Sequence, residues 1–420
     1  MSSLSGAGRE LRLLSRDRAF AIWVVLALLL STLSVLGGID EVAQQRATLA
    51  RLVEADRVDR ADAHRQHPDW GGAAYYGFHL TYDPPSDFAF AALGVRDQAP
   101  WKHRVRMLAL EGQIYARDAG NPVLALVGRF DFAFFAAYVV PLLLIVVLHD
   151  LQTSERTAGR HALLVSTARE GPGLWRLRAT LRVGTIAFVA LLPLLLGCAW
   201  TGTQLPVTLA ASALFLAYCA FWGLLAFWMA ARPRSSEQIL STLVGLWLLL
   251  GIVGPALGKL AIDRAVAIPE GSDILMIQRE AVNDAWDLPK EVTMDAFVAQ
   301  HPEWARYAQV EQPFHWKWYY AFQQVGDQKA AALSEAYRSG RRERDRLAAL
   351  AAWLMPPALL ERALQRLAAT DLRAQMDYEQ KVRDFHAELR AFYYARLFPE
   401  KPFAAADLEE LPEFPPAGDS

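Results

Sequence analysis

Two histidines share the same five-residue setting and are the first candidates for metal chemistry. His67 and His301 each stand in the pattern Gln-His-Pro-acid-Trp, at residues 66–70 and 300–304. Two imidazoles could bind a transition metal across a pair of related loops, but such a site needs further ligands that the sequence does not define. The alternative is a shared turn, because His-Pro ends a helix and the acidic residue and Trp can cap and anchor the next element. The turn is the interpretation we favour.

Other residues of catalytic or ligand type form no complete motif. Asp56, Asp59, Asp62 and His64 fall in a polar stretch that has the pattern of a solvated helix face. Residues 254–259 resemble a phosphate-binding loop, but there is one residue too few between the glycines and no Ser or Thr after the lysine. The zinc-protease, esterase and Cys-rich metal motifs are absent from the sequence. We therefore expect a protein that is not an enzyme and holds no metal or cofactor.

The segment 150–182 has residues suited to contact with a protein or a membrane surface and not to catalysis. Thr153 or Ser154 can cap a short helix over 152–167, and apolar residues at 163–165 give this helix a sticky edge. The residues alone leave two alternatives, a helix that touches a soluble motor protein and a basic loop that lies on anionic headgroups. The segment is rich in arginine and poor in acids, its arginines being Arg156, Arg160, Arg169, Arg176, Arg178 and Arg182.

The composition indicates a membrane protein with large aqueous parts. Hydrophobic residues make up 53% of the chain, yet charged residues still make up 21%. The net charge of −2 provides no basic field, so nucleic acid is not an expected partner. The two cysteines, Cys198 and Cys219, both lie in apolar runs, where they act as small hydrophobic residues, and no disulfide framework is implied.

Long windows with few or no charges locate five membrane spans, since a bilayer needs roughly 20 apolar residues per helix. Residues 200–206 form a polar turn that divides the longest window into a hairpin. The first span is too long for a cleavable signal peptide and no small-residue cleavage site follows it. A sixth candidate, 347–360, is short and contains two prolines, so we reject it. The expected spans are 19–39, 130–149, 183–201, 205–231 and 238–260.

Arginine in alternate segments sets the expected orientation. The N-terminal arm 1–18, the segment 150–182 and the turn at 232–234 carry the basic residues, and the positive-inside rule places all three in the cytoplasm. Residues 40–129 and 261–420 then form two domains in the periplasm or outside the cell. This orientation predicts a multi-pass protein of the bacterial inner membrane whose C-terminus lies outside.

The two outer domains are expected to be mainly helical. Residues 41–65 favour a helix that continues the first span outward as a stalk. Between Tyr378 and Leu397, apolar residues recur every three or four positions, which predicts a helix with one sticky face. We expect this face to pack within its own domain, the alternative being a docking surface for another protein. The fold class is thus an all-α polytopic membrane protein with about five spans and two mainly helical periplasmic domains.

The segment after the second span resembles the coupling-helix region of ABC-2 type permeases, which carries the pattern E-[KR]-x-x-G followed by L-L-x-S. The tail resembles a subgroup with large outer insertions after the first and fifth spans, through residues 363–371, 382–392 and 411–414. Members usually end with a sixth span, so this chain is expected to be a five-span variant, or the last helix is lost or supplied by another subunit. The residues expected to contact the ATPase are Glu155, Arg156, Gly159, Arg160, Leu163, Leu164 and Ser166.

The resemblance implies a permease subunit driven by a separate cytoplasmic ABC ATPase, which would bind ATP and Mg. A second permease chain, identical or homologous, would complete the assembly in the bilayer. Two outputs are open: export of a substrate, with siderophores as one class, or mechanical work on a periplasmic protein. The alternative from a different class is a membrane-anchored scaffold or sensor without a motor.

Overall fold

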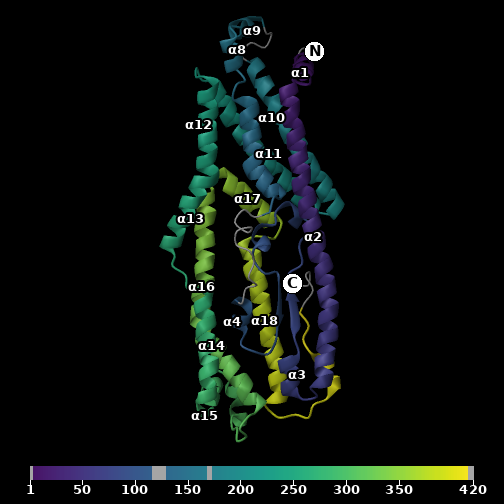
Figure 1. The fold of residues 1–420 in the computed structure, drawn as a ribbon, viewed down its shortest axis with the longest axis vertical. Coiled ribbons are helices and arrows are strands. Elements are labelled where there is room, and N and C mark those ends of the chain that lie inside the picture. Colours follow the sequence, from purple (N-terminus) through teal and green to yellow (C-terminus); the bar gives the residue numbers. More distant parts are fainter. Residues whose placement is uncertain (1–2, 116–128, 168–172, 415–420) are drawn as a thin grey trace.

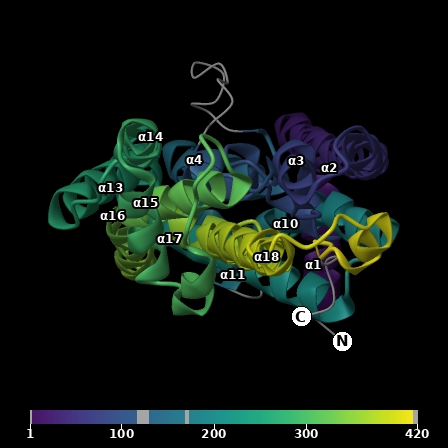
Figure 2. The ribbon, with the colours of Figure 1, turned by 90° about the horizontal axis from the view of Figure 1, so that it is seen from below.

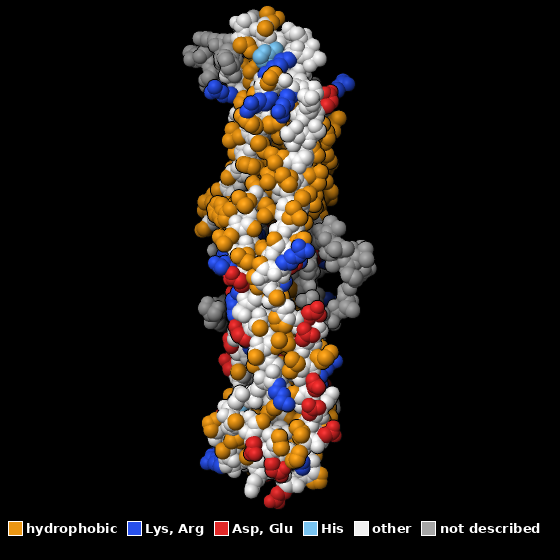
Figure 3. Space-filling view, turned by 90° about the vertical axis from the view of Figure 1, so that its left-hand side faces the viewer, with side chains coloured by type: hydrophobic (Ala, Val, Ile, Leu, Met, Phe, Trp, Pro, Cys, Tyr) orange, Lys and Arg blue, Asp and Glu red, His pale blue; other side chains and the backbone are white. Residues whose placement is uncertain are grey.

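A computed structural model describes residues 3–115, 129–167 and 173–414 as an elongated, mostly helical molecule (Figure 1). In the space-filling view, hydrophobic side chains cover a broad band of the upper half below a group of basic side chains near its top end, while acidic and basic side chains are scattered over the lower half (Figure 3). We call residues 3–39 and 132–265 the apolar half. Residues 40–115 and 266–414 are the polar half.

Five helical segments are long and apolar enough to cross a membrane, in agreement with the five expected spans. The third begins earlier than expected, because its helix continues through Arg176, Arg178 and Arg182 beyond the apolar run. The region 347–360 is not among the five, and it contains a break between two helices. The segments are α2 (Arg18–Gln66), Phe132–Thr157 with α6 (Phe132–Phe134), α7 (Val140–Leu148) and α8 (Thr153–Thr157), α10 (Gly173–Thr201), α11 (Leu205–Ala230), and Ser236–Ala265 with α12 (Ser236–Leu248) and α13 (Gly254–Ala265).

Helix α2 belongs to both halves. It begins after Asp17, whose carboxylate accepts hydrogen bonds from the backbone N–H groups of Ala19 and Phe20, and it runs without interruption for 49 residues to Gln66. At 1.5 Å per residue its length is about 74 Å, more than twice the thickness of a bilayer core. The expected helical continuation of the first span over 41–65 is therefore confirmed.

The polar half is helical apart from one small sheet. Strands β1 (His79–Tyr82) and β2 (Lys102–Val105) pair antiparallel, with His79 opposite Val105, and this sheet is an exception to the all-α expectation. The short helices α3 (Trp70–Tyr76), η1 (Ala89–Ala91), η2 (Gly94–Asp97) and α4 (Leu110–Tyr115) accompany it. The longer helices are α14 (Gly271–Asp287), α15 (Lys290–Val298), α16 (Trp316–Ala352), α17 (Pro356–Leu367) and α18 (Leu372–Leu397).

Helix α18 forms the centre of the polar half. Seen from below, it lies between α2 and α3 on one side and the α13–α16 group on the other (Figure 2). The apolar face expected between Tyr378 and Leu397 is buried in the core of this half, together with residues of α3, α4 and α16. The prediction that this face packs inside the protein is confirmed, but its partners include α3 and α4 of the segment 40–129 as well as α16 of its own segment. Its buried residues include Tyr378, Val382, Phe385, Leu389 and Tyr393.

Residues 88–93 join the two halves by entering the core of the apolar half, where they are almost completely buried. The backbone of Phe90 lies against Gly38 of α2, and its ring lies against Gly197 of α10. A methyl group at Gly38 would come within 1.9 Å of the Phe90 carbonyl oxygen, so only glycine permits this approach. The same segment is tied to the turn before α18, where the Thr370 hydroxyl donates to the Ala92 carbonyl at 2.7 Å.

Helix α17 makes a second join. Leu360 and Leu364 on its inner face are buried in the core of the apolar half, and the Tyr138 hydroxyl donates to Glu361 at 3.0 Å. The outer face of α17 carries charge, as expected for an amphipathic helix packed along the ends of apolar helices. The two joins hold the polar half to at least four spans, namely α2, the second span with Tyr138, α10 and α11.

Candidate functional site

The segment 150–167 lies at the extreme end of the apolar half (Figure 1). Helices α8 and α9 (His161–Thr167) sit at the same end as α1 (Ser3–Leu14) and the turn between α11 and α12. The three arginine-bearing segments therefore share one end, as the sequence predicts, while Arg169 lies outside the described residues. The expectation of one helix over 152–167 is wrong, because Gly159 adopts a left-handed conformation (φ +71°) that ends α8 and separates it from α9.

Arg156 anchors α8 to the end of the fourth span. Its guanidinium donates to the backbone carbonyls of Ala231 (3.0 Å) and Arg232 (2.8 Å), and also to Gln152 within its own turn (3.0 Å). These carbonyls belong to the unpaired end of α11, where a cation is also favoured by the helix dipole. Arg156 is therefore a positioning residue that fixes the segment on the apolar half.

Glu155 anchors the same helix to the third span. Its carboxylate pairs with Arg160 at 2.8 Å and lies 3.8 Å from Arg178 on α10. Arg178 in turn pairs with Glu10 of α1 at 2.9 Å. The expected contact residues Glu155, Arg156 and Arg160 are thus brought together, but the first two hold α8 in place and only Arg160 is mostly exposed.

The two leucines of the pattern, Leu163 and Leu164, lie in different environments. Leu164 packs against the core of the apolar half, whereas Leu163 has 62% of its surface exposed. Ser166 is exposed and its hydroxyl donates to the Leu163 carbonyl at 3.0 Å. His161 stacks on Trp175 of α10 with ring centroids 5.3 Å apart, which fixes the start of α9. Of the expected contact residues, Gly159, Arg160, Leu163 and Ser166 are therefore the exposed ones.

The histidine pair occupies two similar turns. His67 is the C-cap of α2 and Asp69 then caps α3 by accepting from the Gly72 N–H at 2.7 Å, as expected for a helix–turn–helix junction. His301 follows α15 and its ring contacts Gln324 at 3.2 Å. Among the residues that the structure describes, no group of three or more His, Cys, Asp or Glu side chains is arranged to hold a metal.

The expectation that Asp56 lies on a solvated helix face is wrong. It is buried, it accepts from the backbone N–H of Leu80 in β1 at 3.1 Å, and it pairs with Arg60 at 3.2 Å. Asp59 remains on the surface, as expected. The difference arises because the small sheet covers this part of α2, and nothing in the local helical pattern indicates that cover.

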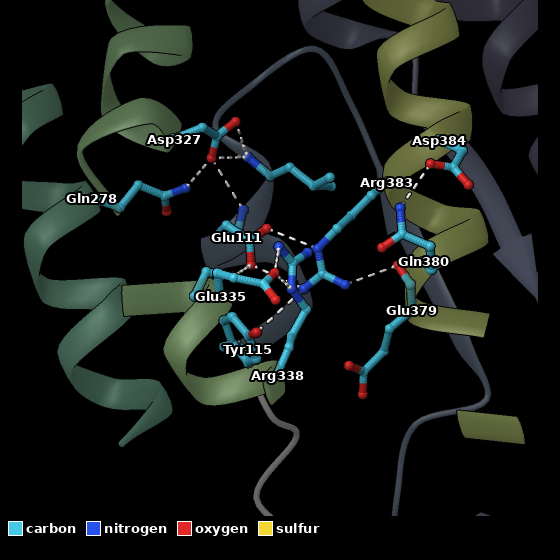
Figure 4. A network of polar contacts seen from close by, with 12 residues as sticks. Glu111, Tyr115, Gln278, Asp327, Glu335, Arg338, Glu379, Gln380, Arg383 and Asp384 are labelled. Atoms are coloured by element: carbon cyan, nitrogen blue, oxygen red, sulfur yellow. Dashed lines mark hydrogen bonds and ion pairs between the residues drawn. The ribbon is translucent and has the colours of Figure 1, made fainter. Parts of the chain in front are cut away.

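A buried network of charges in the polar half was not identified from the sequence (Figure 4). Arg383 of α18 makes two hydrogen bonds to Glu111 of α4, at 2.9 and 3.1 Å, and both side chains are only 10% exposed. Glu111 also accepts from the Ser334 hydroxyl of α16 at 2.9 Å, and Arg383 donates to the Tyr115 hydroxyl at 3.2 Å. One ion pair thus links three helices.

A second buried pair continues the network. Arg390 of α18 pairs with Asp327 of α16 at 2.5 Å, and Asp327 also accepts from Gln278 of α14 at 2.7 Å. Burial and the neighbouring Arg390 charge lower the pKa of His386 to about 3, and its Nε2 lies 2.9 Å from the Arg106 carbonyl. His386 is therefore neutral near pH 7 and donates to that carbonyl.

The spacing of these charges could have indicated burial. Arg383, His386 and Arg390 recur at three and four residues, so they share one side of α18 next to its apolar stripe. A cavity of about 550 Å³ adjoins them between α16, α18 and the turn around His301. Because the charges are paired with one another, we interpret the network as a brace that holds α4, α14, α16 and α18 together.

Comparison with known proteins covers only the C-terminal part of the chain. No curated protein and no solved structure matches this chain. Residues 274–417 match a family described as a domain of unknown function, DUF3526. The match spans about a third of the chain and includes α15 to α18 with most of α14, so it contains Asp327, Arg383 and Arg390 of the buried network.

Proposed function

We propose that this chain is the membrane-spanning permease subunit of an ABC transporter, driven by a separate ATPase that docks on α8 and α9. The end carrying these helices would lie in the cytoplasm, which is the side that the positive-inside rule favours for its arginine-rich segments. The polar half would lie on the opposite side of the membrane. A second permease chain would complete the assembly, and ATP with Mg would be bound by the partner ATPase.

The observation that carries this proposal is the way α8 and α9 are mounted. They project at the end opposite the polar half, and they are fixed to the α11 turn by Arg156 and to α10 by Glu155. A force on the exposed surface around Leu163 would therefore act directly on two spans. The same segment carries the pattern that resembles the coupling helix of ABC-2 type permeases.

Mechanical transmission to the polar half is the output that the geometry favours. The spans α2 and α10 enclose Phe90, and α11 packs against α17, so movement of these spans would be passed to the polar half through two buried joins. The brace formed by Glu111, Arg383, Asp327 and Arg390 would keep the polar half rigid during this movement. Export through a path between two permease chains is the second output.

Replacement of Leu163 by aspartate tests the docking surface. The tagged chain would be co-expressed with its candidate ATPase and purified in detergent, and the ATPase recovered per permease would be measured together with ATP hydrolysis. Burial of one leucine at an interface contributes about 1.5–3 kcal/mol, so we expect at least a tenfold loss of ATPase affinity. Leu164 is unsuited to this test because it packs inward.

Val292→Asp provides the matched control. Val292 is an apolar residue of α15, 50% exposed, in the polar half at the other end of the molecule. This variant should bind the ATPase like the wild type. Equal ATPase recovery with the Leu163 variant would contradict docking at α8 and α9. Failure of any ATP-binding protein to associate with the wild-type chain would favour the scaffold or sensor.

A further inference from the structure

A cavity of about 490 Å³ lies where the two halves meet, bounded by α13, the end of α16 and α17. Its size is within the range of roughly 300–1,000 Å³ that is common for small-molecule sites. The inner face of α17 packs on the apolar half, so the cavity lies beside the outer ends of the spans. Trp353, which lines it, is 73% exposed, and tryptophan favours this depth at a membrane surface.

The lining of the cavity combines two kinds of side chain. The charged residues of the lining, three carboxylates and four cations, come from α13, α16, α17 and the start of α18. A site with this composition suits a molecule that has both an apolar and a polar part. The small or apolar part of the lining includes Pro255, Gly258, Ala348, Ala352, Met355 and Leu359.

Two of the three carboxylates are already engaged by cations of the lining. Asp263 pairs with Lys259 and, at 2.9 Å, with Arg344. Asp345 pairs with Arg362 at 2.7 Å. These ion pairs neutralise most of the charge around the cavity and connect its walls. The charge that is left for a ligand therefore depends on the other two charged residues of the lining, Asp371 and Arg366.

The remaining carboxylate and cation differ in their partners. Asp371 caps α18 by accepting from the Ala374 N–H at 3.1 Å. Arg366 is exposed and, within the described part of the chain, its guanidinium makes no ion pair or hydrogen bond. The cavity therefore offers one uncommitted positive charge beside an apolar lining.

We propose that this cavity binds one acyl chain of an amphiphile that has an anionic headgroup, either a carboxylate or a phosphate. The acyl chain would lie along the alanine, methionine and leucine side chains, and the headgroup would face Arg366. The proposal is independent of ATP coupling, because it concerns binding to this chain alone. Two sources share the required chemistry, a phospholipid of the bilayer and a free fatty acid.

Binding to the full-length chain in dodecyl maltoside tests the proposal, with native mass spectrometry as the readout. The probes are palmitate, its uncharged counterpart monopalmitoylglycerol, and phosphatidylglycerol. We expect palmitate to bind more tightly than monopalmitoylglycerol. Arg366→Gln should weaken palmitate about threefold to fivefold, as for loss of an exposed ion pair, and leave monopalmitoylglycerol unchanged.

Ala348→Phe tests the apolar part by filling the cavity, and it should abolish binding of both palmitate and monopalmitoylglycerol. The controls lie on the outer surface of the same helix, namely Ala336→Phe for added bulk and Arg342→Gln for the lost charge. Displacement of palmitate by phosphatidylglycerol identifies a bilayer lipid as the occupant, and persistence of palmitate identifies a free fatty acid. Equal affinity for palmitate and monopalmitoylglycerol, or unchanged binding by both test variants, would overturn the proposal.

Discussion

Replacing Arg156 by alanine removes the tie between α8 and the end of the fourth span. The wild-type guanidinium makes charge-assisted hydrogen bonds to the carbonyls of Ala231 and Arg232. Hydrogen bonds to charged groups contribute about 1.5–3 kcal/mol when buried, and Arg156 is half-buried, so we expect the turn after α11 to lose about 1–2 kcal/mol. A loss of this size makes local opening roughly 5–30 times more frequent.

Amide hydrogen exchange followed by mass spectrometry measures this opening directly. Peptides that cover the turn from Ala231 to Ser235 should exchange faster in the Arg156→Ala variant by the factor given above. The control is Arg160→Ala, because Arg160 is 63% exposed in its side chain and pairs only with Glu155 among the described residues. Its removal should leave exchange at the turn unchanged.

Two results would refute the reasoning about Arg156. If exchange in the turn is the same in Arg156→Ala and in the wild type, the hydrogen bonds do not hold the turn. If Arg160→Ala accelerates exchange equally, the effect comes from the net charge of the segment and not from the contacts with the carbonyls. Under the proposed docking of an ATPase on α8 and α9, the Arg156→Ala variant should also weaken the coupling of ATP hydrolysis to output, since the direct tie between α8 and the end of α11 would be lost.

Two predictions concern the polar half. Glu111→Gln should destabilise it by about 3–5 kcal/mol in thermal unfolding, because Arg383 stays buried without its charge partner. The double variant Glu111→Leu with Arg383→Met should recover most of this loss, because it removes both buried charges. Unchanged stability of the single variant would contradict the brace. Because burial lowers the pKa of His386 from 6.5 to about 3, its stabilising contribution is complete above pH 6.5 and decreases by up to about 1.4 kcal/mol per pH unit between 6.5 and 3. His386→Gln, which can still donate to Arg106, should flatten urea-unfolding stability over that range, and an equally steep profile would count against this assignment.

The spans could be predicted because their signal is local. Charged side chains are costly in lipid, so a membrane span appears in the sequence as a long stretch without charge. This criterion locates all five segments. Helix ends were less predictable, since a helix does not stop where its apolar residues stop. Helix α10 continues through Arg176 and Arg178, and α2 continues to Gln66, because backbone hydrogen bonding persists in water when the side chains favour it.

Contacts between distant residues could not be predicted from local patterns. The entry of Phe90 between α2 and α10 depends on Gly38 and Gly197, which look like ordinary helical glycines in the sequence. The burial of Asp56 depends on a strand that follows it by more than 20 residues. The separation of α8 from α9 had a local signal, Gly159, which the interpretation as one coupling helix overlooked.

The length of α2 has a consequence for any protein that meets its far tip. About 27 residues of this helix extend past Ile39, so the tip stands roughly 40 Å from the apolar half. A rotation of α2 by about ten degrees at the bilayer edge would displace that tip by about 7 Å, as follows from the helix rise. A small rearrangement among the spans is therefore geometrically magnified, and the receiving surface must lie well clear of the lipid.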